Sequence, residues 1–280
     1  MPSLLRETLI RLEEYKFLIP HYKELLDILE EILILREEYS MKMNNGVFTV
    51  DDSLIDVKLS GGFPIIDITR NITNYAEPER YFTALLSLTA ARSDDDADCL
   101  KSTLGDPSLS YPDLMKSVFT GEIGTARFDE KEESDEHFFD LMRFLVEESL
   151  RPALELMVEK YDERIKVHGW FEGYCPICGR EPKIGKLTDN GMNRFLFCNQ
   201  CGYEWFYEKD VCPFCGNDDQ EELAYFIVED DERYRVDVCN FCKRYVKTVE
   251  FDGTNTAVNM DVEDIATLHL DILANEEGYD

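Results

Sequence analysis

Eight of the nine cysteines in this chain of 280 residues form four Cys-x-x-Cys pairs, and all four pairs lie within 68 residues. A spacing of two residues lets both Sγ atoms of a tight turn face one metal ion, and a tetrahedral ion takes four thiolates. The sequence therefore predicts two metal ions per chain, each held by two pairs. The candidate metal ligands are Cys175, Cys178, Cys198, Cys201, Cys212, Cys215, Cys239 and Cys242.

Two of the pairs are near-copies of each other, Cys175-Pro-Ile-Cys-Gly179 and Cys212-Pro-Phe-Cys-Gly216. The proline fixes φ after the first ligand, and the glycine accepts a positive φ after the second. The repeat favours two successive modules, ending at Cys201 and Cys242, because each half has its own knuckle, hairpin and return pair. An interleaved arrangement, in which the first and third pairs share one ion, stays open from the spacing alone.

Four disulfides are the alternative use of these cysteines. Disulfides persist in oxidising compartments, whereas charged residues such as Arg6, Glu7 and Arg11 interrupt any apolar core that a signal peptide would need here. A bond closed within one Cys-x-x-Cys pair is also a redox device rather than a structural staple. We therefore expect reduced, metal-binding cysteines in a cytoplasmic protein.

The metal sites are expected to be closed rather than catalytic. Catalytic zinc sites keep one position for water, whereas four cysteines fill the tetrahedral shell. The four histidines, at positions 21, 137, 168 and 269, make no spacing with a cysteine that suggests a mixed site. We expect no catalytic residue, no further cofactor and no enzyme. Four thiolates suit both zinc and a rubredoxin-type iron, so a structural ion and a one-electron carrier both remain open.

Charge argues against a nucleic-acid partner. The chain carries 59 acidic and 29 basic residues, for a net charge of −30. The segment from Cys175 to Gly253 holds 16 acidic and 10 basic residues, and its small basic patch of Lys243, Arg244 and Lys247 is surrounded by acids. Binding to nucleic acid needs a cationic face that neutralises phosphates. No apolar run reaches the roughly 18 residues that a membrane span requires, so no membrane insertion is expected.

The sequence predicts an α+β fold in which a helical domain precedes the metal modules. Apolar residues recur at helical spacing in residues 4–12 and 25–35, and further helices are expected after Pro78, at Pro112, after Ser134 or Asp135, and from Pro152 to Tyr161. Acidic residues 93–98 are expected to form a solvated loop, and Cys99 beside them is expected to be a small core residue rather than a nucleophile.

Short aromatic or β-branched runs between the cysteine pairs predict strands. They are residues 194–198, 203–207, 223–228 and 234–238. Residues 262–273 predict one amphipathic helix with Ile265, Leu268, Ile272 and Leu273 on one side, which docks back on the body. The predicted domains are residues 1–168 (helical), 169–208 and 209–253 (rubredoxin-like or zinc-ribbon modules), and 254–280 (helical tail).

Several of these motifs together resemble the formate dehydrogenase accessory protein FdhE family. They are the two Cys-Pro-x-Cys-Gly knuckles, Arg194-Phe-Leu-Phe-Cys-Asn-Gln-Cys201 with Glu204-Trp205, Leu223-Ala-Tyr-Phe226, Asp237-Val-Cys-Asn-Phe-Cys-Lys-Arg-Tyr-Val-Lys247 and the tail from Glu263 to Tyr279. The resemblance covers residues 170–279, and Gly62-Phe-Pro-Ile-Ile66 is the best short match in the first half.

The resemblance implies a cytoplasmic assembly factor that binds the catalytic subunit of a molybdenum- or tungsten-dependent formate dehydrogenase, or of a related molybdoenzyme, during maturation. It assigns the family's metal-binding cysteines to the eight named above, with zinc or iron as the metal. Closed metal sites suit a rigid platform for protein contacts. We expect Trp170, Phe171, Tyr203 and Trp205 to be exposed and to anchor the client. An iron electron carrier and a nucleic-acid-binding zinc ribbon are the alternatives.

Overall fold

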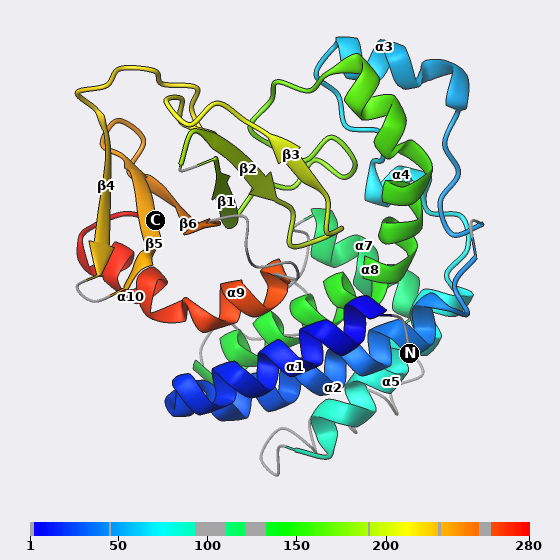
Figure 1. Cartoon of the computed structure of the whole chain (residues 1–280). Coiled ribbons are helices and arrows are strands. Elements are labelled where there is room, and N and C mark those ends of the chain that lie inside the picture. Colours follow the sequence, from blue (N-terminus) through cyan, green and yellow to red (C-terminus); the bar gives the residue numbers. More distant parts are fainter. Residues whose placement is uncertain are drawn as a thin grey trace. The chain divides into compact units, whose positions relative to one another are not determined.

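The computed structural model describes residues 3–44, 46–92, 110–120, 133–189, 191–228, 231–251 and 259–280 (Figure 1). The chain divides into two compact units. The sheet unit comprises Met1–Ile34, Ser53–Ile65 and Tyr161–Asp280, and the helical unit comprises Leu35–Asp52 and Ile66–Lys160. The predicted mixture of leading helices, a cysteine-bearing sheet and closing helices is confirmed.

The sheet unit contains one six-stranded sheet with the order β3-β2-β1-β6-β5-β4. The strands are β1 (Ile184–Thr188), β2 (Asn193–Phe197), β3 (Glu204–Phe206), β4 (Leu223–Val228), β5 (Asp231–Cys239) and β6 (Arg244–Glu250). Neighbouring strands are antiparallel within each cysteine module, whereas β1 and β6 pair in parallel with Ile184 opposite Lys247. The two predicted modules, residues 169–208 and 209–253, therefore share a single sheet.

The four predicted strands correspond to β2, β3, β4 and β5, while β1 and β6 were not predicted. β1 contains Gly185, where an added Cβ would lie 2.7 Å from the carbonyl oxygen of Phe195, so only glycine permits this close approach. β6 contains Lys247, which is buried and forms ion pairs with Asp264 (2.6 Å) and Asp271 (2.7 Å). Glycine is unfavourable in strands and lysine is normally exposed, so Gly185 and Lys247 kept these two segments from being predicted as strands.

Helices α9 (Met260–Ala266) and α10 (Leu268–Glu276) pack on the sheet, as Figure 1 shows. Docking of the tail is confirmed, but the prediction of one continuous helix is wrong. The chain turns at Thr267, whose N–H still bonds the carbonyl of Glu263, and the turn leaves Ile272 58% exposed. Apolar residues of the strands and both helices form one core cluster: Ile184, Phe197, Tyr234, Val236, Val238, Val249, Met260, Leu270 and Ala274.

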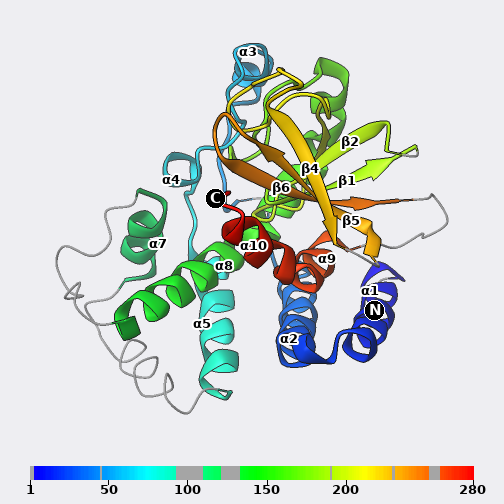
Figure 2. The same cartoon turned by 90° about the vertical axis from the view of Figure 1, so that its left-hand side faces the viewer.

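Helix α1 (Ser3–Leu18) and the first part of α2 (Lys23–Ser40) belong to the sheet unit, with a short 3₁₀ turn η1 (Pro20–Tyr22) between them. They share a second core cluster with α9, made of Leu12, Tyr15, Leu26, Leu33, Val262 and Ala266. Figure 2 shows α9 beside α1 and α2. The same unit also contains η2 (Asp52–Leu54) at its margin and α3 (Ile55–Ser60).

The helical unit contains α4 (Ile68–Asn71), α5 (Ala76–Ala90), α7 (Tyr111–Thr120) and most of α8 (Glu133–His168). The two helices predicted on either side of Pro152 are one helix, because α8 continues through the proline. Glu148 is buried here and accepts hydrogen bonds from Arg36 Nε (2.7 Å) and the Tyr81 hydroxyl (2.8 Å). The predictions for Cys99 and for residues 93–98 lie outside the described residues.

In the part of the chain that the structure describes, no helix has both the length and the apolar character to cross a membrane.

Candidate metal centres

The eight predicted cysteines form two clusters, which we call site 1 (Cys175, Cys178, Cys198 and Cys201) and site 2 (Cys212, Cys215, Cys239 and Cys242). Within each cluster all four Sγ atoms lie within 4.8 Å of one another. The pairs are therefore grouped sequentially rather than interleaved. All eight are free cysteines.

The sulfur positions fit a tetrahedral metal. In site 1 the Sγ atoms of Cys175 and Cys201 lie 3.4 Å apart, and those of Cys178 and Cys198 lie 3.5 Å apart. In site 2 the Sγ atoms of Cys212 and Cys242 lie 3.7 Å apart, and those of Cys215 and Cys239 lie 3.8 Å apart. An ion bonded to four sulfurs at about 2.3 Å holds those sulfurs about 3.8 Å apart. The spacing is far above the roughly 2.05 Å of a disulfide bond. Each cluster can thus hold one ion, and four sulfurs suit zinc and iron equally.

All four cysteine pairs sit on the same backbone turn. In each, the N–H of the residue after the second cysteine donates to the carbonyl of the first, at 2.8 to 3.0 Å. That residue has a positive φ every time, between 60° and 75°. It is Gly179, Gly202, Gly216 or Lys243. The sequence indicated this turn only at Gly179 and Gly216.

Lys243 is the exception, because a non-glycine residue with φ of 60° costs about 1 to 2 kcal/mol. Its carbonyl accepts the N–H of Asp280 (2.8 Å), and its ammonium lies 5.6 Å from the Tyr279 ring. The end of the tail therefore holds this turn in place. The sequence contained no signal for this contact.

A segment from the first half of the chain supports site 1. The N–H of Ile65 donates to the carbonyl of Pro176 inside the first knuckle (2.9 Å), and the Tyr174 hydroxyl donates to the carbonyl of Gly62 (2.5 Å). A Cβ on Gly179 would meet Pro64 at 2.9 Å. Gly62, Pro64 and Ile65, from the stretch that the sequence indicated only as a break and a short family match, thus support the first cysteine knuckle.

The two sites differ in exposure. Three cysteines of site 1 are buried, and Cys178 is half-buried. In site 2, Cys215 is exposed and Cys242 is half-buried. A solvent-borne chelator or thiol reagent therefore reaches site 2 through Cys215.

One thiol in each cluster ionises most readily. Burial opposes ionisation of Cys198, but hydrogen bonds from the thiols of Cys175, Cys178 and Cys201 outweigh it and lower the pKa of Cys198 well below its ordinary value. Burial likewise opposes ionisation of Cys239, whose pKa is lowered by the backbone N–H groups of Cys242 and of the residue before it. A thiolate is the form that binds metal.

Of the four aromatic residues predicted to be exposed, one is exposed. Trp170, Tyr203 and Trp205 are buried, and both indole N–H groups donate to backbone carbonyls, of Tyr174 (2.7 Å) and Glu172 (3.1 Å). Phe171 alone is exposed, at 85%. The sequence analysis missed Phe241, which is exposed and lies between Cys239 and Cys242 of site 2.

The basic patch expected around Lys243 is also smaller than predicted. Lys247 is buried between its two aspartates, and Arg244 forms an ion pair with Glu181 (2.8 Å). These two cations are therefore already neutralised within the sheet unit.

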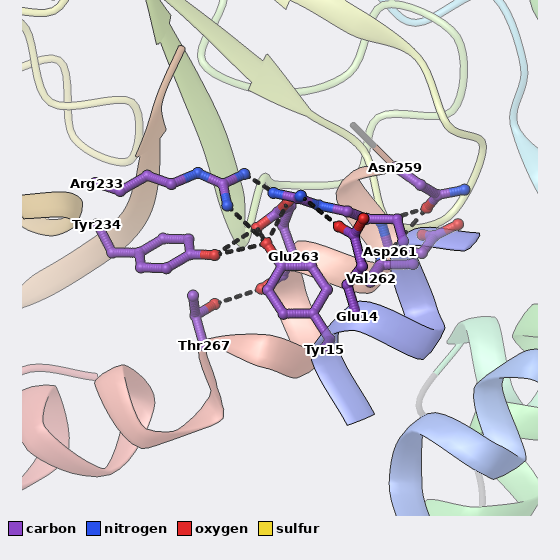
Figure 3. A network of polar contacts seen from close by, with 10 residues as sticks. Glu14, Tyr15, Arg233, Tyr234, Asn259, Asp261, Val262, Glu263 and Thr267 are labelled. Carbon is purple, nitrogen blue, oxygen red and sulfur yellow. Dashed lines mark hydrogen bonds and ion pairs between the residues drawn. The ribbon is translucent and has the colours of Figure 1, made fainter. Parts of the chain in front are cut away.

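A buried polar network joins α1, β5 and α9 (Figure 3). The carboxylate of Glu263 is fully buried and accepts hydrogen bonds from Tyr15 (2.8 Å), Tyr234 (2.7 Å) and Arg233 (2.7 Å). Burial, and then the charge of Glu263, raise the pKa of both tyrosines above the ordinary value. Within the sheet unit, the network thus connects α1 to β5 and α9.

Comparisons with known proteins agree with this architecture. A model described as "FdhE, central domain" matches residues 174–209, and one described as "FdhE, C-terminal domain" matches residues 211–280. "Protein FdhE homolog" from Aquifex aeolicus is 26% identical over 96% of this chain and 90% of its own length. "Protein FdhE homolog" from Pseudomonas aeruginosa is 33% identical to this chain, over 38% of this chain and 36% of the Pseudomonas protein.

A solved structure has the same fold. "The crystal structure of the FdhE protein from Pseudomonas aeruginosa" matches with a TM-score of 0.70, covering 100% of this chain and 94% of that chain at 20% identity. The resemblance to the FdhE family, carried by the cysteine knuckles and the tail, is confirmed.

Proposed function

We propose that this chain, which belongs to the FdhE family through its central and C-terminal domains, is a cytoplasmic, non-enzymatic assembly factor. Its client is the catalytic subunit of a formate dehydrogenase or a related molybdoenzyme, bound during maturation. In this proposal the eight cysteines ligate two metal ions, and residues 169–208 and 209–253 act as two metal modules on one scaffold.

The observation that carries the proposal is the family match across both metal modules. Two closed four-thiolate clusters in one continuous sheet suit a rigid platform, because four cysteines leave no ligand position for a substrate. Such a platform holds its surface side chains in fixed positions, which lowers the entropy lost on binding a partner.

We place the client contact beside site 1, at Phe171. This ring is 85% exposed and follows Trp170, which is anchored by its hydrogen bond to the Tyr174 carbonyl. An exposed aromatic ring on a rigid base is the kind of side chain that dominates binding at protein interfaces. The backbone around it leads directly into the first metal knuckle at Cys175.

The test is a pull-down of a formate dehydrogenase catalytic subunit by the metal-loaded full chain. Phe171→Ser should reduce capture about tenfold or more, as for an aromatic hot spot. Phe17→Ser is the matched control, because Phe17 is 86% exposed on α1, far from Phe171 in sequence. Equal loss with both variants would reject Phe171 as the anchor. Absence of capture by the unmodified chain would reject the function.

The metal dependence is tested separately. Changing both Cys175 and Cys178 to Ser should abolish capture, because site 1 then lacks two ligands and its module loses the folding energy that the ion supplies. Full capture by demetallated protein would contradict a metal-dependent scaffold.

The exposure of Cys215 supports a second candidate function, a rubredoxin-like electron carrier at site 2. An exposed ligand brings an iron ion close to a redox partner. Protein purified without added metal should then contain iron and lose its visible colour on reduction. A colourless zinc protein eliminates this candidate and leaves the scaffold.

A further inference from the structure

A cavity of about 210 Å³ opens beside site 2, and its walls differ in character from the rest of this acidic chain. Cys212 and Cys239 are among its lining residues, so the cavity adjoins site 2. Its charged lining consists of Arg194, Lys209, Arg235 and Arg244 against Asp210 and Asp237. Arg244 is already paired with Glu181 (2.8 Å), which leaves three cations against two anions, a small positive excess in a chain of net charge −30.

Arg194 is a buried cation in the wall of this cavity, with only 2% of its side chain exposed. One terminal nitrogen donates to the carbonyls of Glu208 (2.5 Å) and Val211 (2.6 Å). Carbonyls accept these hydrogen bonds but carry no charge to offset the guanidinium. Among the residues that the structure describes, Nε has no hydrogen-bond partner.

Asp237 is the carboxylate nearest to Arg194, and Arg235 already engages it. Its Oδ2 lies 3.8 Å from Arg194, whereas its Oδ1 lies 2.8 Å from Nε of Arg235. The single negative charge of Asp237 is thus shared between the guanidinium groups of Arg194 and Arg235. An arginine remains charged at any physiological pH, and a buried charge is costly unless it is paired. The pair of arginines therefore attracts a second anion.

Apart from Gln220, most of the remaining lining is apolar or aromatic. Leu223 and Val246 lie on the same face of the sheet as Arg235 and Asp237, and the exposed ring of Tyr225 lies 4.7 Å from the Arg235 guanidinium. The volume is below the roughly 300 to 1,000 Å³ of sites for drug-sized ligands. The fitting ligand is therefore small, with a planar anion at one end and an apolar group at the other.

We propose that this cavity binds a carboxylate carried on a short apolar stem. The carboxylate lies against Arg194 and Arg235, and the stem lies against Leu223 and Val246, which share their face of the sheet. A carboxylate matches the planar guanidinium better than a spherical anion does. The same chemistry is offered by a free branched-chain carboxylic acid and by the C-terminal leucine of a peptide. The proposal does not depend on the identity of the client.

The test is calorimetric titration of the metal-loaded full chain at low salt with two pairs of probes. One pair is 3-methylbutanoate and its neutral amide, and the other is N-acetyl-Gly-Gly-Leu with a free or amidated C-terminus. The charged member should bind at least about tenfold more tightly, because it alone makes charge-assisted hydrogen bonds. A preference confined to the first pair identifies a free acid, and one confined to the second identifies a peptide terminus.

Substitutions locate the binding. Arg235→Gln should weaken the charged probe about tenfold or more. Arg70→Gln, which removes the same charge from an 85% exposed side chain in the helical unit, should not change it. Arg194→Lys keeps the charge but not the planar donor pair, so it should also weaken binding if the variant folds. Equal affinity for charged and neutral probes, or undiminished affinity in Arg235→Gln, would overturn the proposal.

Discussion

Replacing Glu263 with glutamine tests how much the buried network contributes to the sheet unit. The carboxylate is 1% exposed at its side chain and accepts three short hydrogen bonds, one of them from the charged Arg233. Removing one partner of a buried ion pair costs about 3 to 5 kcal/mol. Arg233 is 27% exposed and regains some hydration, and the amide oxygen still accepts one tyrosine, so we expect about 3 kcal/mol.

The effect should be local, so the assay is amide hydrogen exchange in α1 together with urea unfolding of the metal-loaded protein. Amides of α1 should exchange about a hundredfold faster in Glu263→Gln, since 1.4 kcal/mol corresponds to a factor of ten. Glu14→Gln makes the same chemical change on α1, in an exposed pair with Arg11. That pair should contribute less than about 1 kcal/mol.

A double-mutant cycle separates the network from simple loss of a charge. Tyr15→Phe alone should cost about 1.5 to 3 kcal/mol, because it removes a hydrogen bond to the Glu263 carboxylate and the hydroxyl that accepts a hydrogen bond from Arg233. The same change should cost less in the Glu263→Gln background, because the charged acceptor is already gone. If Glu263→Gln and Glu14→Gln destabilise α1 equally, or if the two changes are additive, the reasoning is refuted.

Three further outcomes follow from the metal sites and the buried tyrosines. A chelator should release the metal in two kinetic phases, the faster one from site 2, and a thiol reagent should alkylate Cys215 during that faster phase. A single phase, or faster release from site 1, would contradict the difference in exposure between the two sites. Gly173→Ala should destabilise the fold by more than about 3 kcal/mol, because its Cβ would lie 1.8 Å from the Pro213 carbonyl oxygen. A Cβ at Gly216 would meet no atom within 4 Å, so Gly216→Ala should cost only about 1 to 2 kcal/mol for its positive φ. Similar urea midpoints for the two variants would refute this comparison. Burial raises the pKa of nine of the fourteen tyrosines, so the stability they contribute is complete below about pH 10 and is lost as the pH rises further. The nine are Tyr15, Tyr22, Tyr81, Tyr111, Tyr174, Tyr203, Tyr207, Tyr234 and Tyr245. An absorbance titration of the folded protein in which all fourteen ionise near pH 10 would contradict this.

The parts of the metal sites that could be predicted are those that a short stretch of chain decides. Two cysteines separated by two residues form a knuckle through one turn, so the spacing alone identified all eight residues that cluster. The strands β2, β3, β4 and β5 were likewise visible from local runs of aromatic and β-branched residues. Neither inference needed knowledge of distant partners.

The features that could not be predicted depend on partners far along the chain. From the sequence, Lys247 is expected to be a surface cation, whereas in the structure it is buried and paired with Asp264 and Asp271. Trp170 and Trp205 read as exposed anchors, although carbonyls of the same sheet unit take both indole N–H groups. Gly62 reads as a loop residue, yet Tyr174, more than a hundred positions later, bonds its carbonyl. A one-dimensional pattern contains no signal for such pairings.

Proline signals were the other source of error. Pro152 indicated a helix boundary because proline removes one hydrogen bond and clashes with the preceding turn. Helix α8 nevertheless continues from Glu133 to His168. Side chains just before and after the proline, among them Leu150 and Leu154, are buried in the core. Tertiary packing on both sides thus overrides the local penalty.

The pairing of α1 with α9 has a consequence for how the protein is made. The Tyr15 hydroxyl on α1 donates a hydrogen bond to Glu263 on α9, 248 positions later. Helix α1 therefore leaves the ribosome long before α9 has been synthesised. Until then its apolar face, including Leu12, has no place to pack. Contacts of such sequence separation form late and slow down folding. The sheet unit can therefore be completed only after α9 has been synthesised, so a chain truncated before α9 should expose the apolar face of α1 and become a substrate for proteolysis.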